Sequence, residues 1–265
     1  MTEWNAPGYE RIAGLQQAMA AEVLLMLDLK GKERVLDLGC GEGKVTAQIA
    51  ARLPQGSVIG VDASAEMIAF ATRNFGARVR SNLRFETADI RQLAFSDEFD
   101  LVVSFNALHW IPEQDEALHS IHAAMKPEGR AQLRLVPDGE RKSLETVIEE
   151  TRQSARWAGY FRQFRDPYLH LTPERYATLA ERNGLRVLRV NTQDKAWDFK
   201  TRSAFMAFGS VTFIEWTKRL PEEHRLAFVS DVLERYRLEV TNGAGEENTF
   251  KFYQMDITLS RASSP

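Results

Sequence analysis

Residues 35–43 read Val-Leu-Asp-Leu-Gly-Cys-Gly-Glu-Gly, an apolar run typical of a buried strand that leads directly into a turn with three glycines. Glycine tolerates positive φ and has no Cβ, so three glycines within five positions let the backbone come close to a ligand. A second short apolar strand, at 57–61, is followed by Asp62. On neighbouring parallel strands, the loop and Asp62 would hold the two ends of a nucleoside, with the carboxylate accepting hydrogen bonds from ribose hydroxyls. The pattern therefore predicts an enzyme that binds a nucleoside cofactor.

The spacing of the glycines separates two kinds of cofactor. The dinucleotide fingerprint is G-x-G-x-x-G, with a pyrophosphate on the helix N-terminus, whereas the glycines here lie at positions 39, 41 and 43. Glu42 lies inside the loop and would repel a diphosphate, while Asp37 and Asp62 add two carboxylates at the same site. Three acids around one cavity favour a cationic ligand. A nicotinamide enzyme, and a Rossmann-like fold whose degenerate loop holds no cofactor, remain the alternatives.

The loop and the segments after it resemble the class I methyltransferases, which bind S-adenosylmethionine. The family pattern D-x-G-x-G-x-G begins here at Asp37, and the second acid of the family matches Asp62. Three further motifs match in the same order, at residues 87–90, 99–110 and 125–130.

The resemblance implies a role for particular side chains. Asp89 would accept a hydrogen bond from the adenine amino group, and Ile90 would pack on the adenine ring. The cofactor-binding residues that the resemblance implies are Asp37, Gly39, Cys40, Gly41, Asp62, Ala63, Met67, Asp89, Ile90 and Asn106.

Short apolar segments alternate with segments of helical periodicity, which predicts a parallel sheet with helices on both faces. Thr172 and Pro173 mark the start of a late helix, and Pro127 with Gly129 is expected to end an earlier one. The resemblance adds a seven-stranded Rossmann-like α/β sheet whose last strand is antiparallel. The expected strands are 34–38, 57–61, 83–86, 99–104, 130–136, 185–200 and 249–260, and the expected helices are 9–28, 44–52, 64–74, 113–125, 172–184 and 222–239.

The alternation stops after the first half of the chain. Residues 141–170 lack it and are rich in arginine and aromatic side chains, and a second aromatic segment follows at 205–216. We therefore expect a single methyltransferase domain that carries helical cap insertions. Its expected parts are the whole domain at 1–265, a cofactor-binding core at 34–136, and caps at 138–170 and 201–245.

Composition narrows the class of protein. The 34 Lys and Arg against 37 Asp and Glu give a formal net charge of −3 without a basic stripe, which argues against a nucleic-acid substrate. The single cysteine, Cys40, lies in the glycine loop and cannot form an internal disulfide, so we expect a cytoplasmic protein without cysteine-cluster or metal chemistry. We expect no secretory signal and no membrane span. The expected partner is a small molecule. We expect the protein to be a monomer or a homodimer.

Residues 106–110 follow the fourth expected strand, where open α/β sheets bind ligands. The Leu-His-Trp step there resembles juvenile hormone acid methyltransferases, whereas Trp4 and Tyr9 near the start resemble trans-aconitate methyltransferases; both families methylate carboxyl groups. His109, the one candidate catalytic residue, has two readings: a wall residue that hydrogen-bonds the substrate or backbone, which we favour, or a base. The candidate substrate-pocket residues are Trp4, Tyr9, His109, Trp110, Arg156, Trp157, Tyr160, Arg165 and Phe208.

A carboxylate acceptor is already ionised at neutral pH and needs no base. Methyl transfer to it depends on desolvation and proximity, and positioning of this kind contributes roughly 7–11 kcal/mol. We therefore expect O-methylation of the carboxylate of an organic or fatty acid. Two alternatives stay open: methylation of a phenol, amine or carbanion of a secondary metabolite with His109 as base, and a cofactor-binding regulatory subunit without activity.

Overall fold

The computed structural model describes residues 6–169, 171–241 and 243–262, with side chains from Gly14 onward apart from 16 and 17. The chain forms two compact units. The first, here named the sheet unit, comprises residues 20–137, 169–193 and the chain from 254 onward. The second, the helical unit, comprises the chain up to residue 19 together with 138–168 and 194–253.

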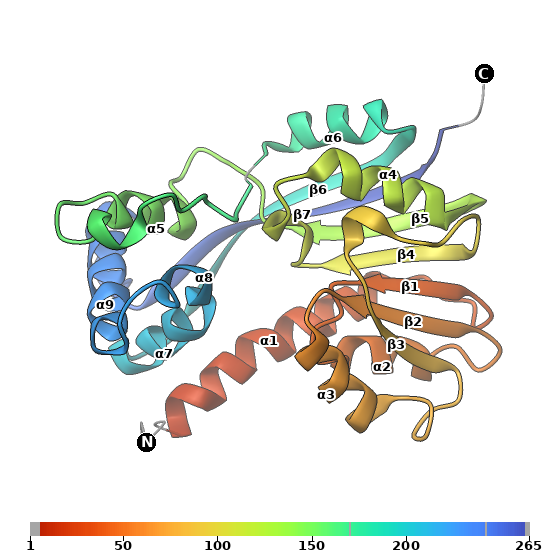
Figure 1. Cartoon of the computed structure of the whole chain (residues 1–265), viewed down its shortest axis with the longest axis horizontal. Helices are drawn as coiled ribbons and strands as arrows, with labels where there is room; N and C mark the ends of the chain where they lie inside the picture. Colours follow the sequence, from red (N-terminus) through yellow and green to blue (C-terminus); the bar gives the residue numbers. More distant parts are fainter. Residues whose placement is uncertain (1–5, 170, 242, 263–265) are drawn as a thin grey trace. The chain divides into compact units, whose positions relative to one another are not determined.

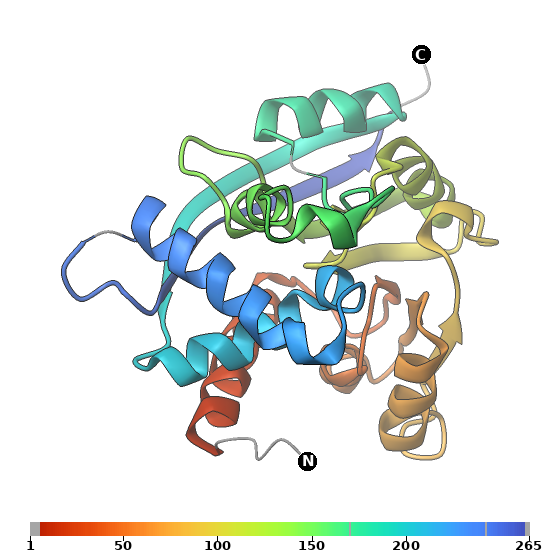
Figure 2. The same ribbon diagram turned by 60° about the vertical axis from the view of Figure 1, so that its left-hand side comes forward.

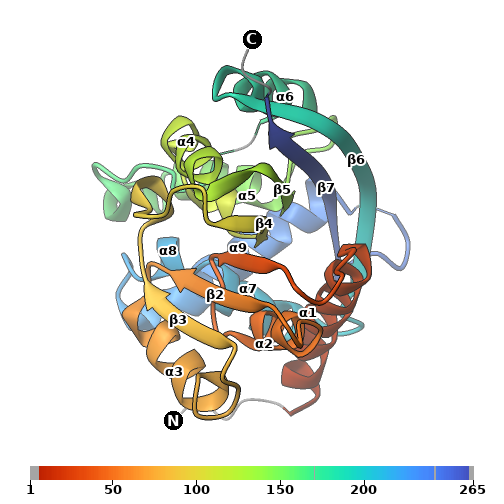
Figure 3. The ribbon, with the colours of Figure 1, turned by 90° about the vertical axis from the view of Figure 1, so that its right-hand side faces the viewer.

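Seven strands form one sheet: β1 (Arg34–Leu38), β2 (Ser57–Asp62), β3 (Leu83–Thr87), β4 (Phe99–Phe105), β5 (Met125–Leu135), β6 (Leu185–Asp198) and β7 (Thr249–Arg261). Their order is β3-β2-β1-β4-β5-β7-β6 (Figures 1 and 3). Strands β3, β2, β1, β4 and β5 are parallel to one another, whereas β7 is antiparallel to β5. The predicted Rossmann-like sheet with an antiparallel last strand is thereby confirmed.

The helices of the sheet unit cover both faces of this sheet. Successive strand residues point to opposite faces of the sheet. Leu36 packs in one hydrophobic core with residues of α4 and α6, whereas Val35 packs in another with residues of α2 and with Leu27. Thr172 caps α6 by accepting a hydrogen bond from the Arg175 N–H at 3.3 Å, which confirms the predicted helix start. The helices are α2 (Lys44–Ala51), α3 (Ala65–Phe75), α4 (Gln114–Ala124) and α6 (Pro173–Arg182), with short 3₁₀ helices η1 (Ile90–Gln92) and η2 (Leu108–Trp110); α1 (Ala6–Met26) belongs to this unit from residue 20 onward.

Pro127 and Gly129 are expected to end the helix at 113–125, and α4 does end before them; the expected start of the next strand, at residue 130, is wrong. α4 already ends at Ala124, and β5 begins at the next residue. Met125 pairs with Phe99, but the next paired residue of β5 is Arg130, so 126–129 form an irregularity in the strand. Proline cannot donate to a sheet ladder and is tolerated at such irregularities, which is why the segment reads like a helix stop in the sequence.

The helical unit contains α5 (Leu144–Arg152), η3 (Ala158–Phe161), α7 (Arg202–Thr212), α8 (Ile214–Thr217) and α9 (Glu222–Glu239). α9, the long blue helix in Figure 2, packs on α5 and α7. An aromatic cluster fills the space beside α7: Phe199 and Phe205 are buried, and their ring centroids lie 5.2 Å apart. The segments expected to be caps, 138–170 and 201–245, contribute these helices, and their role as caps stays a prediction.

Candidate functional site

The site is built where β1 and β2 end. Asp37, in β1, is buried and accepts a hydrogen bond from the Thr46 hydroxyl of α2 at 2.7 Å. Burial raises the pKa of Asp37 to about 6, and the nearby charge of Asp62 adds to this rise. The hydrogen bond ties the start of α2 to the end of the strand, so the loop between them is held at both ends.

All three loop glycines have positive φ: 71° at Gly39, 53° at Gly41 and 81° at Gly43. A Cβ at Gly39 would overlap the Cβ of Ala107, and a Cβ at Gly43 would lie 2.7 Å from Ala71. At Gly41 a Cβ would meet no described atom within 4 Å. Two glycines are therefore required by packing inside the protein, and the middle one lies against open space.

The end of β2 is joined to the loop by hydrogen bonds. The Asp62 carboxylate accepts from the Gly41 N–H and from the Ser64 N–H, both at 2.9 Å. The N–H groups of Gly39 and Cys40 donate to the Val61 carbonyl at 2.8 and 3.0 Å. Because the carboxylate is fixed by backbone groups on both sides, its remaining lone pairs keep a defined direction.

A cavity of about 480 Å³ lies beside the loop, within the usual size of small-molecule sites, roughly 300–1,000 Å³. It lies at the carboxyl ends of parallel strands, where open α/β sheets bind ligands. Its lining residues are Gly39, Asp62, Ala63, Asp89, Ile90, Arg91, Asn106, Ala107, Trp110, Ile111, Pro112 and Glu113.

Asn106 lines this cavity and also carries a buried side-chain oxygen without a described partner. Its backbone has a φ of 59°, and its N–H donates to the Arg134 carbonyl at 2.8 Å. Its side-chain Oδ1 is buried, and no described residue donates to it. A buried amide oxygen without a partner is costly, so the geometry suits a ligand that carries a hydrogen-bond donor.

Three charged side chains line another part of the cavity. The Arg91 guanidinium donates from Nη2 to Asp89 Oδ2 at 2.6 Å and from Nε to Asp89 Oδ1 at 3.0 Å. Its Nη1 donates to Glu113 Oε2 at 3.0 Å. The hydrogen bonds from Arg91 hold the pKa of Asp89 below its ordinary value, so this carboxylate is an ionised acceptor at neutral pH.

Six of the ten expected cofactor residues line the cavity, namely Gly39, Asp62, Ala63, Asp89, Ile90 and Asn106. Asp37 is buried below the loop, and Met67 is 47 % exposed on α3. Burial raises the pKa of the Cys40 thiol far above its usual range, so this thiol is inert. Arg91 and Glu113 also line the cavity, and the sequence analysis did not predict them. For Glu113, the only local feature that could have indicated a role is its position just before α4.

The expected substrate residues are divided between the two units. Trp110 lines the cavity of the sheet unit, and His109 is buried beside it. Trp4 and the side chain of Tyr9 lie outside the described residues. The other five, Arg156, Trp157, Tyr160, Arg165 and Phe208, belong to the helical unit.

His109 is held by backbone groups. It is 5 % exposed, and its Nδ1 accepts a hydrogen bond from the Val136 N–H at 3.2 Å. Its carbonyl accepts from the Leu169 N–H at 3.0 Å. A backbone N–H is only a donor, so Nδ1 of His109 is unprotonated in this arrangement and the neutral ring carries its proton on Nε2.

In the helical unit, Asp231 holds two of the expected residues. It accepts from Arg156 Nη1 at 2.8 Å and from Trp157 Nε1 at 2.9 Å. Phe208 packs between Phe199 and Phe250, with ring centroids 4.9 and 5.2 Å away. Tyr160 and Arg165 are exposed, and the ring of Tyr160 lies against His224.

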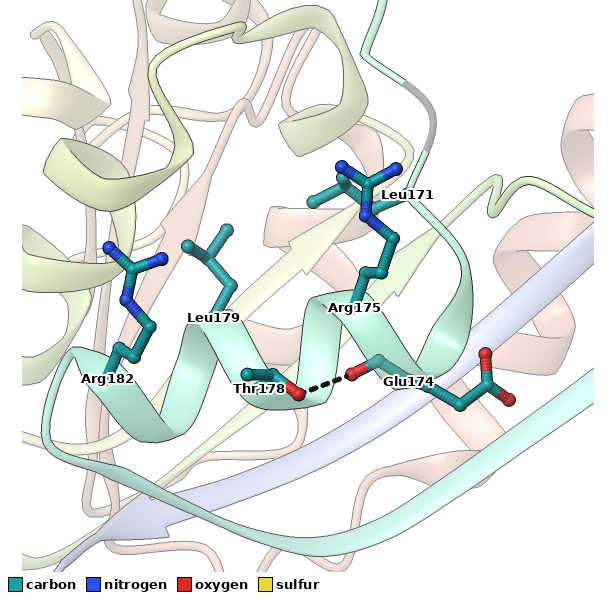
Figure 4. Close-up of a pocket in the computed structure, with 6 residues that line it drawn as sticks. All are labelled: Leu171, Glu174, Arg175, Thr178, Leu179 and Arg182. Atoms are coloured by element: carbon teal, nitrogen blue, oxygen red, sulfur yellow. Dashed lines mark hydrogen bonds between the residues drawn. The ribbon is translucent and has the colours of Figure 1, made fainter.

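A second hollow, of about 320 Å³, lies along α6 (Figure 4). Leu179 lies between Arg175 and Arg182, which extend to the same side of the helix. The Thr178 hydroxyl donates to the Glu174 carbonyl at 2.9 Å and is thereby satisfied within the helix. This hollow has no glycine loop and no strand-end carboxylate, so it does not share the chemistry of the first cavity.

The first cavity matches the groups of S-adenosylmethionine. Asp62 would accept from ribose hydroxyls and Asp89 from an adenine amino group, and Asn106 lines the same cavity. The buried Asp37 adds negative charge that favours a cationic sulfonium. Fold and cavity together define an α/β enzyme with a nucleoside sulfonium cofactor.

Comparison with known proteins agrees with this class. Residues 35–129 match the family described as a methyltransferase domain. Trans-aconitate 2-methyltransferase of Deinococcus radiodurans is 31 % identical over 218 residues, which cover 81 % of this chain and 79 % of that protein. Malonyl-[acyl-carrier protein] O-methyltransferase of Acetivibrio thermocellus is 32 % identical over 127 residues, 47 % of this chain and 44 % of that protein.

Among solved structures, phosphoethanolamine N-methyltransferase 2 of Haemonchus contortus, in complex with S-adenosylhomocysteine, has a TM-score of 0.61 at 18 % identity. The match covers 93 % of this chain and 53 % of that one, and it shows a shared fold. The chain therefore belongs to the class I S-adenosylmethionine-dependent methyltransferases, and among them it resembles the trans-aconitate methyltransferases. In the described part of the chain, no helix is long and apolar enough to cross a membrane.

Replacing Asp62 by alanine is expected to weaken the affinity for S-adenosylhomocysteine. Hydrogen bonds to charged groups contribute about 1.5–3 kcal/mol, so loss of the carboxylate should raise Kd about 100-fold. Asp62→Asn keeps one acceptor and should raise Kd about 10-fold. Isothermal titration calorimetry measures both values.

Glu66→Ala is the matched control for this experiment, because Glu66 is an exposed acid of α3 that does not line the cavity. Its Kd should equal that of the wild type. A folded Asp62→Ala protein with an unchanged Kd contradicts the role of this carboxylate.

Proposed function

We propose that this enzyme transfers the methyl group of S-adenosylmethionine to a carboxylate oxygen of a small organic acid. The observation that carries the proposal is the likeness to trans-aconitate 2-methyltransferase of Deinococcus radiodurans. Its 218 aligned residues cannot fit within the first 136 residues, so the likeness extends beyond the cofactor-binding half. The shorter likeness to a malonyl-[acyl-carrier protein] O-methyltransferase supports the same kind of acceptor.

Methyl transfer to an ionised carboxylate needs no general base. The bound cofactor supplies an electrophilic methyl group on a positively charged sulfur. The ionised acceptor neutralises this charge as the new bond forms, so a dry site and an in-line approach accelerate the reaction. Asp62, Asp89 and Asn106 would hold the cofactor, each as a hydrogen-bond acceptor toward a different part of it.

The hydrogen bond to His109 supports an acceptor that needs no base. The Nδ1 lone pair of His109 accepts from the Val136 N–H, and the proton on Nε2 makes this nitrogen a donor. A donor can hold a carboxylate oxygen, whereas a general base needs a free lone pair. We propose that His109 forms part of the wall of the acceptor site. That Trp110, Arg156, Trp157, Tyr160, Arg165 and Phe208 contact the acceptor stays a prediction.

The acceptor class is tested with labelled cofactor and a panel of di- and tricarboxylic acids, fatty acids, phenols and amines. We expect labelled products from acids only, and alkali should release the label because methyl esters are saponified. Label in alkali-stable ethers or amines, with none in esters, would overturn the proposal.

A variant of His109 separates the two roles of this residue. The amide oxygen of His109→Asn can accept from the Val136 N–H in place of Nδ1, but the side chain does not titrate. If His109 is a wall residue, kcat/KM should fall less than about 10-fold, whereas loss of a general base lowers the rate about 10²–10⁴-fold. The pH profile of kcat should keep its shape in the first case and lose a limb in the second.

A further inference from the structure

Arg91 connects two loops that line the cofactor cavity. Asp89 and Arg91 lie at the start of η1, directly after β3, and Glu113 lies just before α4. The guanidinium contacts both oxygens of Asp89 and one oxygen of Glu113, and all three side chains line the cavity. The backbone N–H of Arg91 also donates to Asp89 Oδ1, at 2.9 Å.

These contacts fix the direction of the Asp89 carboxylate. A bidentate arginine holds a carboxylate in one plane, and the link to Glu113 restrains the guanidinium itself. An ionised carboxylate has about four acceptor positions; the three N–H groups of Arg91 use three of them and leave about one for a ligand. A carboxylate that is exposed by 41 % and not held in this way would rotate in solvent and offer no fixed acceptor.

We propose that Arg91 is a positioning residue that determines specificity for the adenine base of the cofactor. By holding Asp89 as an oriented acceptor, Arg91 lets the site select a base with a 6-amino donor over one with a 6-oxo group. This inference concerns the cofactor alone and does not depend on which acceptor is methylated.

The test compares the affinities of S-adenosylhomocysteine and S-inosylhomocysteine, which differ at position 6 of the base. Calorimetry on the wild type should give an affinity ratio of about 10 or more in favour of the adenosyl ligand, as expected for a hydrogen bond to a charged group. Arg91→Gln should reduce the ratio to about 3 or less, and Asp89→Ala should bring it to about 1. Arg91→Lys should restore part of it, because one ammonium cannot chelate both oxygens.

Arg84→Gln is the matched control. Arg84 also forms a half-exposed ion pair, with Glu86 at 2.8 Å in β3, but neither residue lines the cavity. This variant should keep the wild-type ratio. The proposal is overturned if the wild type binds both ligands equally. It is also overturned if a folded Arg91→Gln keeps the wild-type ratio, whether its two affinities are unchanged or fall by the same factor.

Discussion

Gly41→Ala is expected to weaken cofactor binding about 100-fold in a protein that stays folded, whereas Gly39→Ala is expected to lose the fold of the loop. Both positions have positive φ, and an L-residue there costs about 1–2 kcal/mol. At Gly41 the added methyl group meets no described atom within 4 Å, and the glycine loop is the part of the family pattern that is expected to face the cofactor, so we expect this methyl group to meet the ligand. At Gly39 it overlaps Ala107, and overpacking adds about 1–3 kcal/mol.

The expected result is a separation of binding from stability. Gly41→Ala should weaken S-adenosylhomocysteine about 100-fold, by the same overpacking penalty exerted on the ligand, and should lose about 1–2 kcal/mol of unfolding free energy. Gly39→Ala should lose about 3 kcal/mol or more. Calorimetry and urea unfolding measure the two quantities.

Gly245→Ala provides the control for backbone strain alone. Gly245 has a φ of 84°, and a Cβ there would meet no described atom within 4 Å, but it lies in the helical unit and outside the described cavity. It should lose as much stability as Gly41→Ala and keep the wild-type affinity. If Gly41→Ala binds the ligand as tightly as Gly245→Ala does, the ligand does not approach the loop at this point.

Asp256→Ala is expected to lose about 3 kcal/mol of unfolding free energy, a loss similar to that of Gly39→Ala. Arg134 in β5 is 2 % exposed, and its Nε and Nη2 donate to Asp256 of the paired strand at 2.6 and 2.9 Å. Removing one partner of a buried ion pair costs about 3–5 kcal/mol, because a charge is left without compensation. Glu22, 3.1 Å from Nη1, remains and places the expected loss at the lower end of that range. Urea unfolding at neutral pH measures the loss.

Two variants give this prediction its scale. Glu86→Ala removes the acid of the exposed pair with Arg84 and should cost less than about 1 kcal/mol. Arg134→Met combined with Asp256→Leu removes both charges and should be more stable than Asp256→Ala alone. A loss in Asp256→Ala as small as that in Glu86→Ala would show that the Arg134 charge is solvated after all.

The ion pair of Arg134 with Asp256 also supports the cofactor site. The carbonyl of Arg134 accepts from the Asn106 N–H, and this bond accompanies the positive φ of Asn106. The strand that contains the buried arginine therefore also holds Asn106, a residue that lines the cavity. Asp256→Ala should therefore lower the affinity for the cofactor as well as the stability of the protein.

Local patterns were sufficient for much of this protein. The strand at 34–38 and the helix at 222–239 have the predicted bounds, because apolar periodicity and turn residues act within a few positions along the chain. The glycine loop and the acid after β2 lie within one β-α-β unit, so their spacing alone predicted the cofactor. Before Pro127 and Gly129 the helix end was predicted within one residue, but the next strand was expected from residue 130, whereas β5 begins at Met125.

The tertiary structure decided what depends on residues far apart in the chain. The link from Arg91 to Glu113, the pair of Arg134 with Asp256, and the use of His109 Nδ1 by the Val136 N–H each join segments that no periodicity relates. A sequence pattern shows which face of an element is apolar, but the partner of a charged or polar group is set by sheet order and loop packing. Sequence therefore determined the class of enzyme, and the folded chain determined which residues line the cavity and which groups orient them.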